Sequence, residues 1–392
     1  MPQSAISDIV QTGEFASRDA RSRPPFRADH VGSLLRPARL LEARAQAEAG
    51  AITAAELQRV EDAAIGRAAA LQKEVGLRVI TDGEYRRTYF HLDFLTQIEG
   101  MESYLDAGAT HFHTASGQTL DFSPPRLRVS GRIERRSPIM RRDYEVVAEE
   151  AAFDGAAKIT IPSPTMALRG GRAAVDQAAY PDLGDFHTDL ARVYREEIAD
   201  LAEAGCRYLQ LDDTNLAYLC DEAQREAARR AGQDPDALPF AYAWLINQAL
   251  ASAPKEMFTA IHLCRGNFKS AFVAEGGYEP VAEALFHEID VDAFLLEYDD
   301  ARSGSFEPLS RVPADKYVVL GLISSKTPEL ESKDEIKRRI DEAARFVPLE
   351  QLCLSPQCGF SSTCHGNALS EDDQRRKLEL VVECAEEVWG QA

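Results

Sequence analysis

The sequence has no apolar run that approaches the roughly 18 residues needed to cross a membrane. Its N-terminus also lacks the basic segment followed by an apolar one that marks a secretory signal peptide. Basic residues are scarce, because 44 Lys and Arg stand against 64 Asp and Glu and leave a net charge of −20. Nucleic acids and anionic membranes attract basic surfaces, so this charge disfavours both as partners.

The cysteine spacing of a disulfide-stapled domain is absent as well. The 7 Cys residues are scattered and odd in number, which predicts a reducing, cytoplasmic environment. Neither a solenoid repeat nor a low-complexity linker interrupts the chain. Its 392 residues are many for one domain but normal for a barrel with insertions. We therefore predict a polar N-terminal arm at 1–25 and one domain at 26–392.

Apolar segments with strand character alternate along the chain with segments of helical periodicity. The expected strands are 26–33, 77–84, 157–164, 208–213, 257–264, 294–299, 317–323 and 352–358. The expected helices are 37–49, 53–75, 138–152, 184–204, 221–231, 238–252, 278–287, 333–345 and 371–388. Thr53 and Glu56 form a capping-box pattern at the start of the second helix. This alternation predicts an α/β fold of the (β/α)8, or TIM, barrel type.

Residues 85–136 break this rhythm between the second and third strands. Segments 112–114, 120–122 and 127–131 alternate apolar and polar residues with a period of two, and turn residues separate them. Such a pattern is typical of paired strands. We therefore expect a β-ribbon inserted into one connection of the barrel.

Polar residues of ligand type follow the apolar core of nearly every expected strand. In a parallel barrel these strand ends form the active-site face, whereas chance would scatter such residues along the strands. The residues in question are Ser33, Glu84, Ser163, Asp212, Cys264, Glu297, Ser324 and Cys358.

Three of these strand ends carry the residue types that zinc prefers. His262 and Cys264 are two positions apart, so an extended backbone turns both side chains to one face. Glu297 and Cys358 follow two other apolar runs. If the ends converge, the four residues make a zinc site. The alternatives are packing of His262 and Cys264 in the core, or a closed structural zinc site, which usually uses closely paired cysteines that are absent here.

Four segments resemble the zinc-containing catalytic barrel of cobalamin-independent methionine synthase, and in particular its short single-barrel branch. They are Arg27–Pro37, His262–Asn267, Leu296–Asp299 and Ser355–Phe360. The resemblance extends from about residue 26 to residue 390. It implies that His262, Cys264, Glu297 and Cys358 bind Zn2+, and that the enzyme activates the thiol of homocysteine.

The resemblance also implies roles in binding the amino acid. Val31, Gly32 and Ser33 match the homocysteine-binding turn. Glu84 matches the carboxylate that receives the ammonium group, and Asp212 matches a second such carboxylate near the reacting atoms. The alternative is that these carboxylates pair with Arg86, Arg87 or Lys326. His30 is either a substrate contact or a core residue of the first strand.

Three departures from the family concern the methyl donor and the chain length. The full-length enzymes carry a second, N-terminal barrel for which this chain has no room. Their folate-stacking tryptophan after the third strand has no counterpart in Pro162–Met166. Their proton-donating histidine after the seventh strand falls on Lys326, a weak acid at neutral pH unless burial lowers its pKa. These changes favour a donor with a better leaving group than methyl-folate, such as a methyl-corrinoid.

The leading hypothesis is a zinc-dependent methyltransferase that forms methionine from homocysteine and a methyl-folate or methyl-corrinoid, with Lys326 and Asp212 as catalytic residues. Alternatives are another zinc-dependent thiol alkyltransferase, such as epoxyalkane:coenzyme M transferase, or a non-catalytic zinc-binding protein. A decarboxylase of the uroporphyrinogen type should lack the zinc ligands. A homo-oligomer and a corrinoid protein are compatible partners. Cys364 and His365, in a Ser-rich loop, are expected to be incidental.

Overall fold

A computed structural model of the protein describes residues 24–392, except 107, 109, 115–116 and 152–154. Most of the expected arm at 1–25, and the expected end of one helix at residue 152, lie outside the described residues. The division into an arm and one domain at 26–392 therefore stays a prediction.

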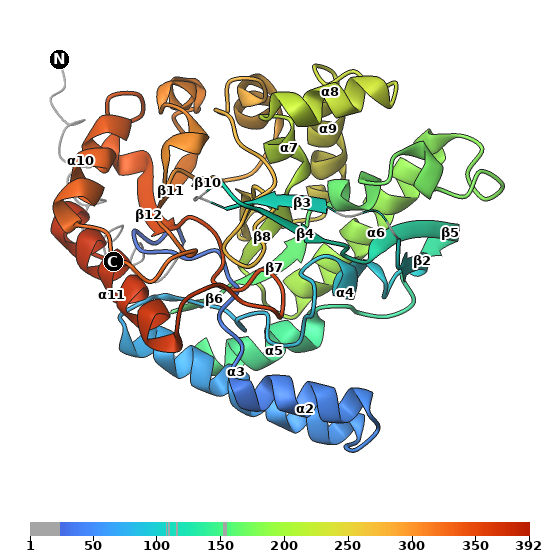
Figure 1. Ribbon diagram of the computed structural model, residues 1–392, viewed down its shortest axis with the longest axis horizontal. Coiled ribbons are helices and arrows are strands. Elements are labelled where there is room, and N and C mark those ends of the chain that lie inside the picture. Colours follow the sequence, from blue (N-terminus) through green and yellow to red (C-terminus); the bar gives the residue numbers. More distant parts are fainter. Residues whose placement is uncertain (1–23, 107, 109, 115–116, 152–154) are drawn as a thin grey trace, which may run out of the picture.

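Six parallel strands form the central sheet, in the order β7–β8–β9–β10–β11–β12 (Figure 1). Their bounds are Ile159–Pro162 (β7), Tyr208–Asp213 (β8), Phe258–Leu263 (β9), Ala293–Glu297 (β10), Tyr317–Ile323 (β11) and Leu352–Pro356 (β12). Each strand pairs with the next one along the chain, which is the result of repeated crossover connections between parallel neighbours.

The remaining strand segments continue this order around a barrel. Strand β1 (Val79–Ile80) pairs in parallel with β6 (Ala156–Ala157), which leads directly into β7. On the other side, Ala28 pairs in parallel with Leu354 of β12. The chain just after the expected first strand, 26–33, is joined to the expected second strand, 77–84, by a backbone hydrogen bond. In it the Leu34 N–H donates to the Gly83 carbonyl at 3.1 Å. The arrangement is that of a (β/α)8 barrel.

The first two strands are much shorter than the sequence indicates. The expected strand at 26–33 contributes one bridge, at Ala28, and the strand expected at 77–84 contributes only β1. The physical reason is the backbone of the turns that follow. Gly32, Gly83 and Glu84 all have positive φ angles, which end an extended segment.

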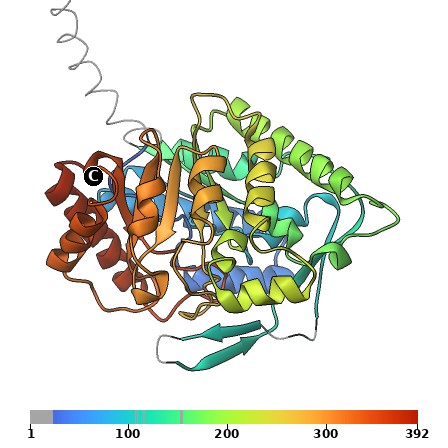
Figure 2. The same cartoon turned by 90° about the horizontal axis from the view of Figure 1, so that it is seen from above.

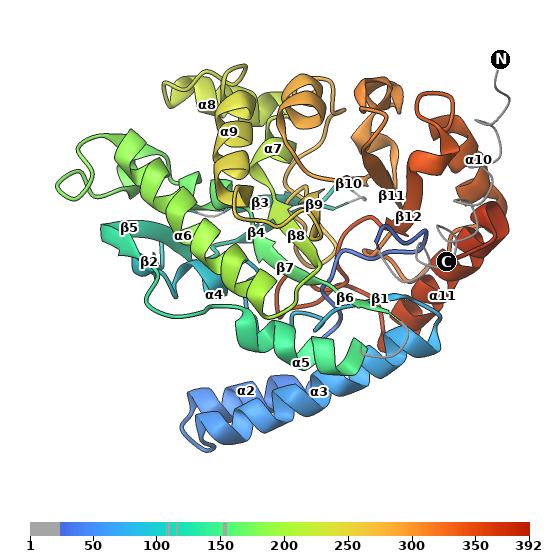
Figure 3. The same ribbon diagram turned by 180° about the vertical axis from the view of Figure 1, so that it is seen from behind.

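Helices cover the outside of the strands, and Figure 3 shows α3, α5 and α6 along one side. Their bounds are Ala38–Glu48 (α2), Ala54–Glu74 (α3), Arg141–Ala151 (α5), Leu183–Glu203 (α6), Asn215–Tyr218 (α7), Glu222–Arg230 (α8), Leu238–Leu250 (α9), Lys333–Ala343 (α10) and Glu371–Trp389 (α11). The capping box at Thr53 and Glu56 is confirmed. An ion pair of 3.1 Å between Arg375 and Glu74 joins α11 to α3.

The helix expected at 278–287 is wrong in extent. Helical turns begin only after Val281, and Ala284–Glu288 forms a π-helix. Pro280 disfavours a helical backbone at the preceding residue, Glu279, so the helix cannot begin at residue 278. Among the described residues, none of the helices combines the length and the apolar character that a membrane crossing needs.

The barrel interior is apolar at one level and polar at the strand ends. An apolar cluster fills the part of the interior that is farther from the C-terminal ends of the strands: Phe26, Val31, Val79, Tyr208, Ala260, Ala293, Leu295, Val319 and Cys353. Alternate residues of a strand share a face, so the chain turns Gln210 and Asp212 inward above Tyr208, and His262 inward above Ala260. The sequence thus places its polar inward residues at one end of the barrel.

The insertion between β1 and β6 contains two antiparallel strand pairs and a short helix, α4 (Leu92–Leu95). Strands β2 (Glu99–Tyr104) and β5 (Arg126–Glu134) pair with each other, and β3 (Thr110–His113) and β4 (Thr119–Phe122) form a hairpin. Backbone hydrogen bonds of 2.7 and 2.9 Å between His113 and Phe272 tie the hairpin to the loop after β9. In Figure 2 the teal hairpin lies as a separate layer against the barrel.

Candidate metal centre and substrate cavities

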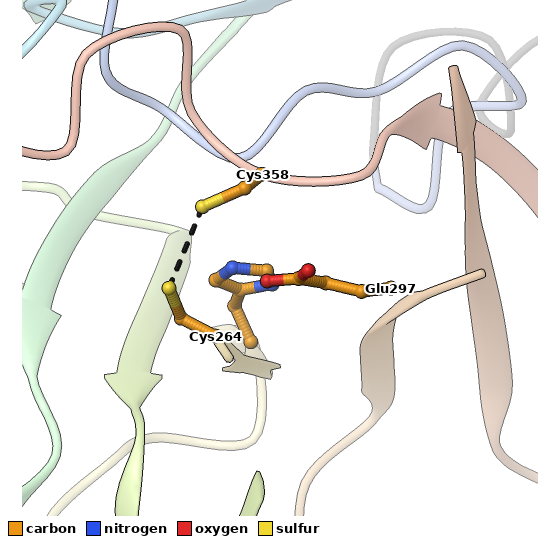
Figure 4. Close-up of side chains that lie close together, drawn as sticks. Cys264, Glu297 and Cys358 are labelled. Carbon is orange, nitrogen blue, oxygen red and sulfur yellow. Dashed lines mark hydrogen bonds between the residues drawn. The ribbon is translucent and has the colours of Figure 1, made fainter. Parts of the chain in front are cut away.

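The four residues expected to bind zinc converge at the ends of three strands. His262 lies on β9, Cys264 follows it, Glu297 ends β10, and Cys358 follows β12. All four are buried, and their ligand atoms lie within 4.8 Å of one another. Figure 4 shows Cys264 and Cys358 pointing toward each other, with the Glu297 carboxylate beside them. The sequence spacing therefore brings together a donor set of one imidazole, two sulfurs and one carboxylate.

The separation of the two sulfur atoms is close to the one expected for two ligands of a shared zinc ion. They lie 3.5 Å apart, whereas two sulfurs each roughly 2.3 Å from one tetrahedral zinc lie about 3.8 Å apart. Asn267 Nδ2 donates to Cys264 Sγ at 3.4 Å, and Ser362 Oγ lies 3.5 Å from Cys358 Sγ. The hydrogen bond with Cys358 lowers the pKa of the Cys264 thiol well below its usual range. The same contact raises the pKa of Cys358.

His262 is oriented as a metal ligand by its backbone contact. Its Nδ1 lies 3.2 Å from the Leu295 carbonyl oxygen, which selects the tautomer with a proton on Nδ1. The other ring nitrogen, Nε2, is buried and has no hydrogen-bond partner in the described structure. A buried polar atom without a partner is costly, and a metal ion beside Cys264 and Cys358 would satisfy it. The donor set and this unpaired nitrogen fit zinc.

The Glu297 carboxylate is held by protein donors on both oxygens. Oε1 accepts from the Arg265 N–H at 2.9 Å and from Asn267 Nδ2 at 2.6 Å. Oε2 accepts from Arg302 Nη2 at 3.0 Å and from Gln357 Nε2 at 3.1 Å. Burial by itself would raise the pKa of Glu297, but the nearby cations, chiefly those of Lys326 and Arg302, outweigh it and lower the pKa to about 2. Glu297 is therefore an anion at every physiological pH.

A small cavity lies against the two sulfurs and is lined by both expected ammonium-binding carboxylates, Glu84 and Asp212. Glu84 Oε2 is buried without a partner, and Gln210 Nε2 holds Asp212 Oδ1 at 2.7 Å. Burial, and then the charge of Glu84, raises the pKa of Asp212 to about 7. Arg87 Nη1 lies 3.9 Å from Glu84 Oε1, which is one of the pairings named above as the alternative, and it offsets part of the repulsion between the two carboxylates. A cationic ligand such as an ammonium group in the cavity would offset it further.

Backbone strain and close approach shape this cavity. Glu84 has a φ of 57°, a left-handed conformation that a non-glycine residue adopts only under constraint. Gly32, with a φ of 135°, packs against Thr160, where an added Cβ would lie 2.8 Å from a methyl group. A Cβ at Gly359 would lie 1.9 Å from Ser33 Oγ. The turn at 31–33 is thus pressed against the turn that carries Cys358.

A second, larger cavity of about 440 Å³ meets the small one at Cys264, which lines both. The insertion supplies one wall with Tyr104, Phe112 and Phe122. Among the described residues that line it are two arginines, Arg126 and Arg169, and no carboxylate. Arg126 is paired with Asp106 at 3.0 Å, whereas Arg169 donates to the Tyr218 hydroxyl at 3.0 Å. In a protein of net charge −20, a cavity without acidic groups fits an anionic ligand.

Two side chains expected to act on the substrate, those of Lys326 and His30, line neither cavity, and Gly32 of the expected binding turn does not line one either. Lys326 is 5% exposed, and its Nζ lies 3.3 Å from Asp299 Oδ2. His30 is 1% exposed, and burial lowers its pKa to about 4. Neither residue is among those that surround the cavities. A catalytic role for Lys326 and a substrate contact for His30 stay predictions.

Some residues around the site were not identified from the sequence. Asn267 and Gln357 lie within the recognised strand-end segments, so their amides could have been noticed there. Arg302 follows Glu297 by five residues in a polar loop, where no periodic signal distinguishes it. Cys364 and His365 are not part of the candidate ligand group, and the His365 ring packs against Phe122 with 5.5 Å between ring centroids.

Known proteins resemble the chain over almost its full length. The family model for the catalytic domain of the cobalamin-independent synthases matches residues 26–387. Protein YxjH of Bacillus subtilis is 44% identical over 372 residues, which cover 95% of this chain and 97% of the relative. A solved structure from Listeria monocytogenes, assigned to the vitamin-B12 independent methionine synthases, is 37% identical with a TM-score of 0.76, and the match covers 94% of this chain and 100% of that one.

Longer relatives match over part of their length. The 5-methyltetrahydropteroyltriglutamate–homocysteine methyltransferase of Mycolicibacterium paratuberculosis is 26% identical over 400 residues, which cover 98% of this chain and 47% of the relative. The chain thus spans about half of that protein, consistent with a single barrel where the longer proteins have further sequence.

Proposed function

The chain belongs to the cobalamin-independent methionine synthase family, and on that premise we propose that it is a zinc-dependent methyltransferase that converts homocysteine to methionine. The observation that carries the proposal is the small cavity. Its lining combines two buried carboxylates, Glu84 and Asp212, with the cluster of Cys264, Cys358 and His262. An amino acid with a thiol has its ammonium and sulfur groups placed to meet both.

His262, Cys264, Cys358 and Glu297 would hold the zinc ion. A bound zinc ion supplies Lewis acidity that keeps a thiol deprotonated at neutral pH, where a free thiol with a pKa near 8.5 is mostly protonated. All four residues are buried, so the chain shields them from bulk solvent. Asn267 adds a hydrogen bond to Cys264 Sγ, which stabilises negative charge on that sulfur.

Glu84 and Asp212 position the amino-acid part of the substrate. Thr160 Oγ1 donates to Glu84 Oε1 at 3.3 Å, so the second carboxylate oxygen remains for the ammonium group. The turn of Val31, Gly32 and Ser33 borders the same cavity through Val31 and Ser33. Binding at both ends aims the sulfur toward the larger cavity, since Cys264 lines both. Orientation of this kind supplies much of the rate enhancement in a displacement reaction.

The larger cavity is where the methyl donor binds. The substrate sulfur attacks the methyl carbon, a carbon–sulfur bond forms, the bond from the methyl group to its carrier breaks, and the carrier keeps the electron pair. For a folate carrier the released nitrogen takes up a proton. A volume of about 440 Å³ is of the size that encloses a small organic molecule. It is small for a corrinoid macrocycle, so the cavity favours methyl-folate as the donor.

The alternative functions fit the small cavity less well. A coenzyme M transferase should present cations to the sulfonate, but the lining pairs the sulfurs with Glu84 and Asp212. A non-catalytic zinc protein would need neither these carboxylates nor a cavity on the donor side. The cytoplasmic location, the oligomeric state and a corrinoid partner stay predictions.

The proposal is tested by methyl transfer with purified, zinc-loaded protein. Homocysteine is offered with methyltetrahydrofolate as monoglutamate, with its triglutamate form and with methylcobalamin, and methionine is measured by mass spectrometry. We expect methionine from at least one folate donor. Glu84→Gln should raise KM for homocysteine by about tenfold or more, since a charge-assisted hydrogen bond is lost. The exposed variant Glu256→Gln is the control. No methionine from any of the donors would overturn the proposal.

A further inference from the structure

A chain of buried charges leads away from Glu297 and the candidate metal centre. Arg302 Nη2 contacts Glu297 Oε2 at 3.0 Å and Asp299 Oδ1 at 2.8 Å, and Lys326 Nζ contacts Asp299 Oδ2 at 3.3 Å. The exposed side-chain fractions are 0% for Glu297, 6% for Arg302, 3% for Asp299 and 5% for Lys326. Burying four charges is costly even when they are paired, so a structural purpose alone is a weak explanation for them.

Hydrogen bonds saturate the Glu297 carboxylate. A carboxylate offers about four lone-pair sites, and Glu297 already accepts from Arg265 N–H, Asn267, Arg302 and Gln357. These donors compete with a metal ion for the same lone pairs. Of the four candidate ligands, Glu297 is thus the one whose lone pairs are already occupied by protein donors where it lies.

The geometry around Arg302 fixes this position of the carboxylate. The guanidinium carbon lies 4.8 Å from the centre of the Phe272 ring, and a further ion pair joins Arg302 to Asp300. Asp299 contacts both Arg302 and Lys326, so the lysine stabilises the aspartate that orients the arginine. Gln357 Oε1 accepts from Ser325 Oγ at 2.9 Å, which in turn directs the amide nitrogen of Gln357 to Glu297.

We infer that Arg302 and Gln357 form a receiving site for the Glu297 carboxylate, and that Lys326 supports this site through Asp299. The inference rests on the proposed zinc site. With the receiving site intact, Glu297 binds the metal weakly and gives way when the substrate thiol enters. Lys326 is then a positioning residue, and its ammonium group points to Asp299 and not to the donor cavity.

A receiving site and a merely structural role for Arg302 predict opposite effects of its loss on zinc retention. If Arg302 only held the fold around the metal, its loss would weaken zinc retention. If it competes for Glu297, its loss leaves the carboxylate on the metal, so zinc is retained equally or more tightly while the thiol binds more weakly. Loss of a buried charge-assisted hydrogen bond predicts a rise of about tenfold or more in the apparent Kd for homocysteine.

The experiment compares wild type with Arg302→Gln and Arg302→Lys, with Arg311→Gln as the control. Arg311 is also in an ion pair, 2.7 Å from Glu283, but both side chains are more than half exposed. Zinc X-ray absorption is recorded with and without homocysteine, zinc affinity is measured by competition with a chelator, and homocysteine Kd by calorimetry. We expect Arg302→Gln to keep oxygen in the zinc shell at thiol concentrations that replace it in wild type. Arg302→Lys should recover part of the homocysteine affinity.

A second variant, Lys326→Met, keeps the inference testable if Arg302→Gln does not fold. It should raise the homocysteine Kd by about two- to fivefold and lower kcat/KM equally for folate and corrinoid donors. Weakened zinc retention in Arg302→Gln, or a wild-type Kd for homocysteine in Lys326→Met, would overturn the inference. Should wild type itself gain no sulfur neighbour from homocysteine, the proposed function would fail instead, and the two failures are distinguishable.

Discussion

At the residue scale, the two cysteines of the candidate centre differ from the other buried cysteines in their surroundings. The Cys264 and Cys358 sulfurs lie 3.5 Å apart beside an unpaired histidine nitrogen. Cys353 is equally buried on β12, but it packs in the apolar interior and burial raises its pKa to about 12. Among the cysteines of the described residues, only Cys264 and Cys358 belong to a group placed to share a metal ion.

We therefore predict that Cys264→Ser and Cys358→Ser lose most of their zinc, because a serine hydroxyl is a much poorer ligand than a thiolate. Cys353→Ser should retain one zinc per chain. Metal content is measured by mass spectrometry after dialysis against a weak chelator, and circular dichroism checks that each variant is folded. Full zinc retention in both Cys264→Ser and Cys358→Ser would exclude this site.

The sequence identified the candidate ligands because each stands at a strand end, where position follows from the fold. His262 and Cys264 share a face by the two-residue period of an extended backbone, and a barrel brings Glu297 and Cys358 to the same rim. The direction of Lys326 could not be derived in this way. Lys326 is in a loop, and its partner Asp299 belongs to a different loop, so only the tertiary structure decides where its ammonium group points.

At the element scale, the insertion forms a wall of the larger cavity. The Phe122 ring of β4 stacks on Phe268 with 4.3 Å between centroids, and Phe112 of β3 contacts the same ring at 5.1 Å. All three residues line the cavity. The hairpin therefore contributes its aromatic side chains to the space where the donor is proposed to bind.

Phe122→Ala should weaken donor binding and leave thiol binding unchanged. An aromatic contact contributes about 0.5–1.5 kcal/mol beyond the area it buries, so we expect KM for the donor to rise about three- to tenfold. Leu105→Ala is the matched control, because Leu105 belongs to the same insertion and is 82% exposed. Steady-state kinetics with each substrate varied in turn measure the effect. A rise in the homocysteine KM alone would contradict this role for the hairpin.

The elements that the sequence predicted best are those with local signals. Helix α3 begins at a capping box, and strand β8 matches its expected range of 208–213. The strand partners within the insertion were harder to predict from the sequence, because β5 follows the β3–β4 hairpin but pairs with β2, which precedes it. Period-two patterns reveal that strands exist, but the choice of partner depends on contacts far apart in the chain.

At the scale of the whole molecule, the (β/α)8 prediction is confirmed by the fold shared with the Listeria structure. The barrel order follows from right-handed crossovers that place consecutive strands side by side. The resulting rim gathers polar residues from segments as distant as Ser33 and Cys358. The insertion between β1 and β6 extends across this part of the barrel, and Figure 1 shows its strands β3 and β4 there.

Charge at this scale bears on the choice between the candidate donors. The protein carries a net charge of −20, yet the lining of the larger cavity has no carboxylate and includes Arg169. Among the ion pairs of the described residues, none involves Arg169. The missing tryptophan and the position of Lys326 favour a better leaving group than folate, whereas the volume and charge of the cavity favour a small anionic donor. A donor must bind before it can react, so the volume and charge of the cavity count for more than the missing tryptophan and the position of Lys326.

We therefore predict that methyltetrahydrofolate, which carries carboxylates, is used with a higher kcat/KM than methylcobalamin. Arg169→Ala should lower kcat/KM for the folate about tenfold, since a hydrogen bond to a charged group contributes roughly 1.5–3 kcal/mol, and should leave the methylcobalamin rate within about twofold. Arg126→Ala is the comparison, because Asp106 already neutralises that arginine. Lys326→His tests the opposite view, in which a better acid raises the folate rate. A wild-type methylcobalamin rate well above the folate rate, unaffected by either arginine, would show that the cavity does not select the donor by charge.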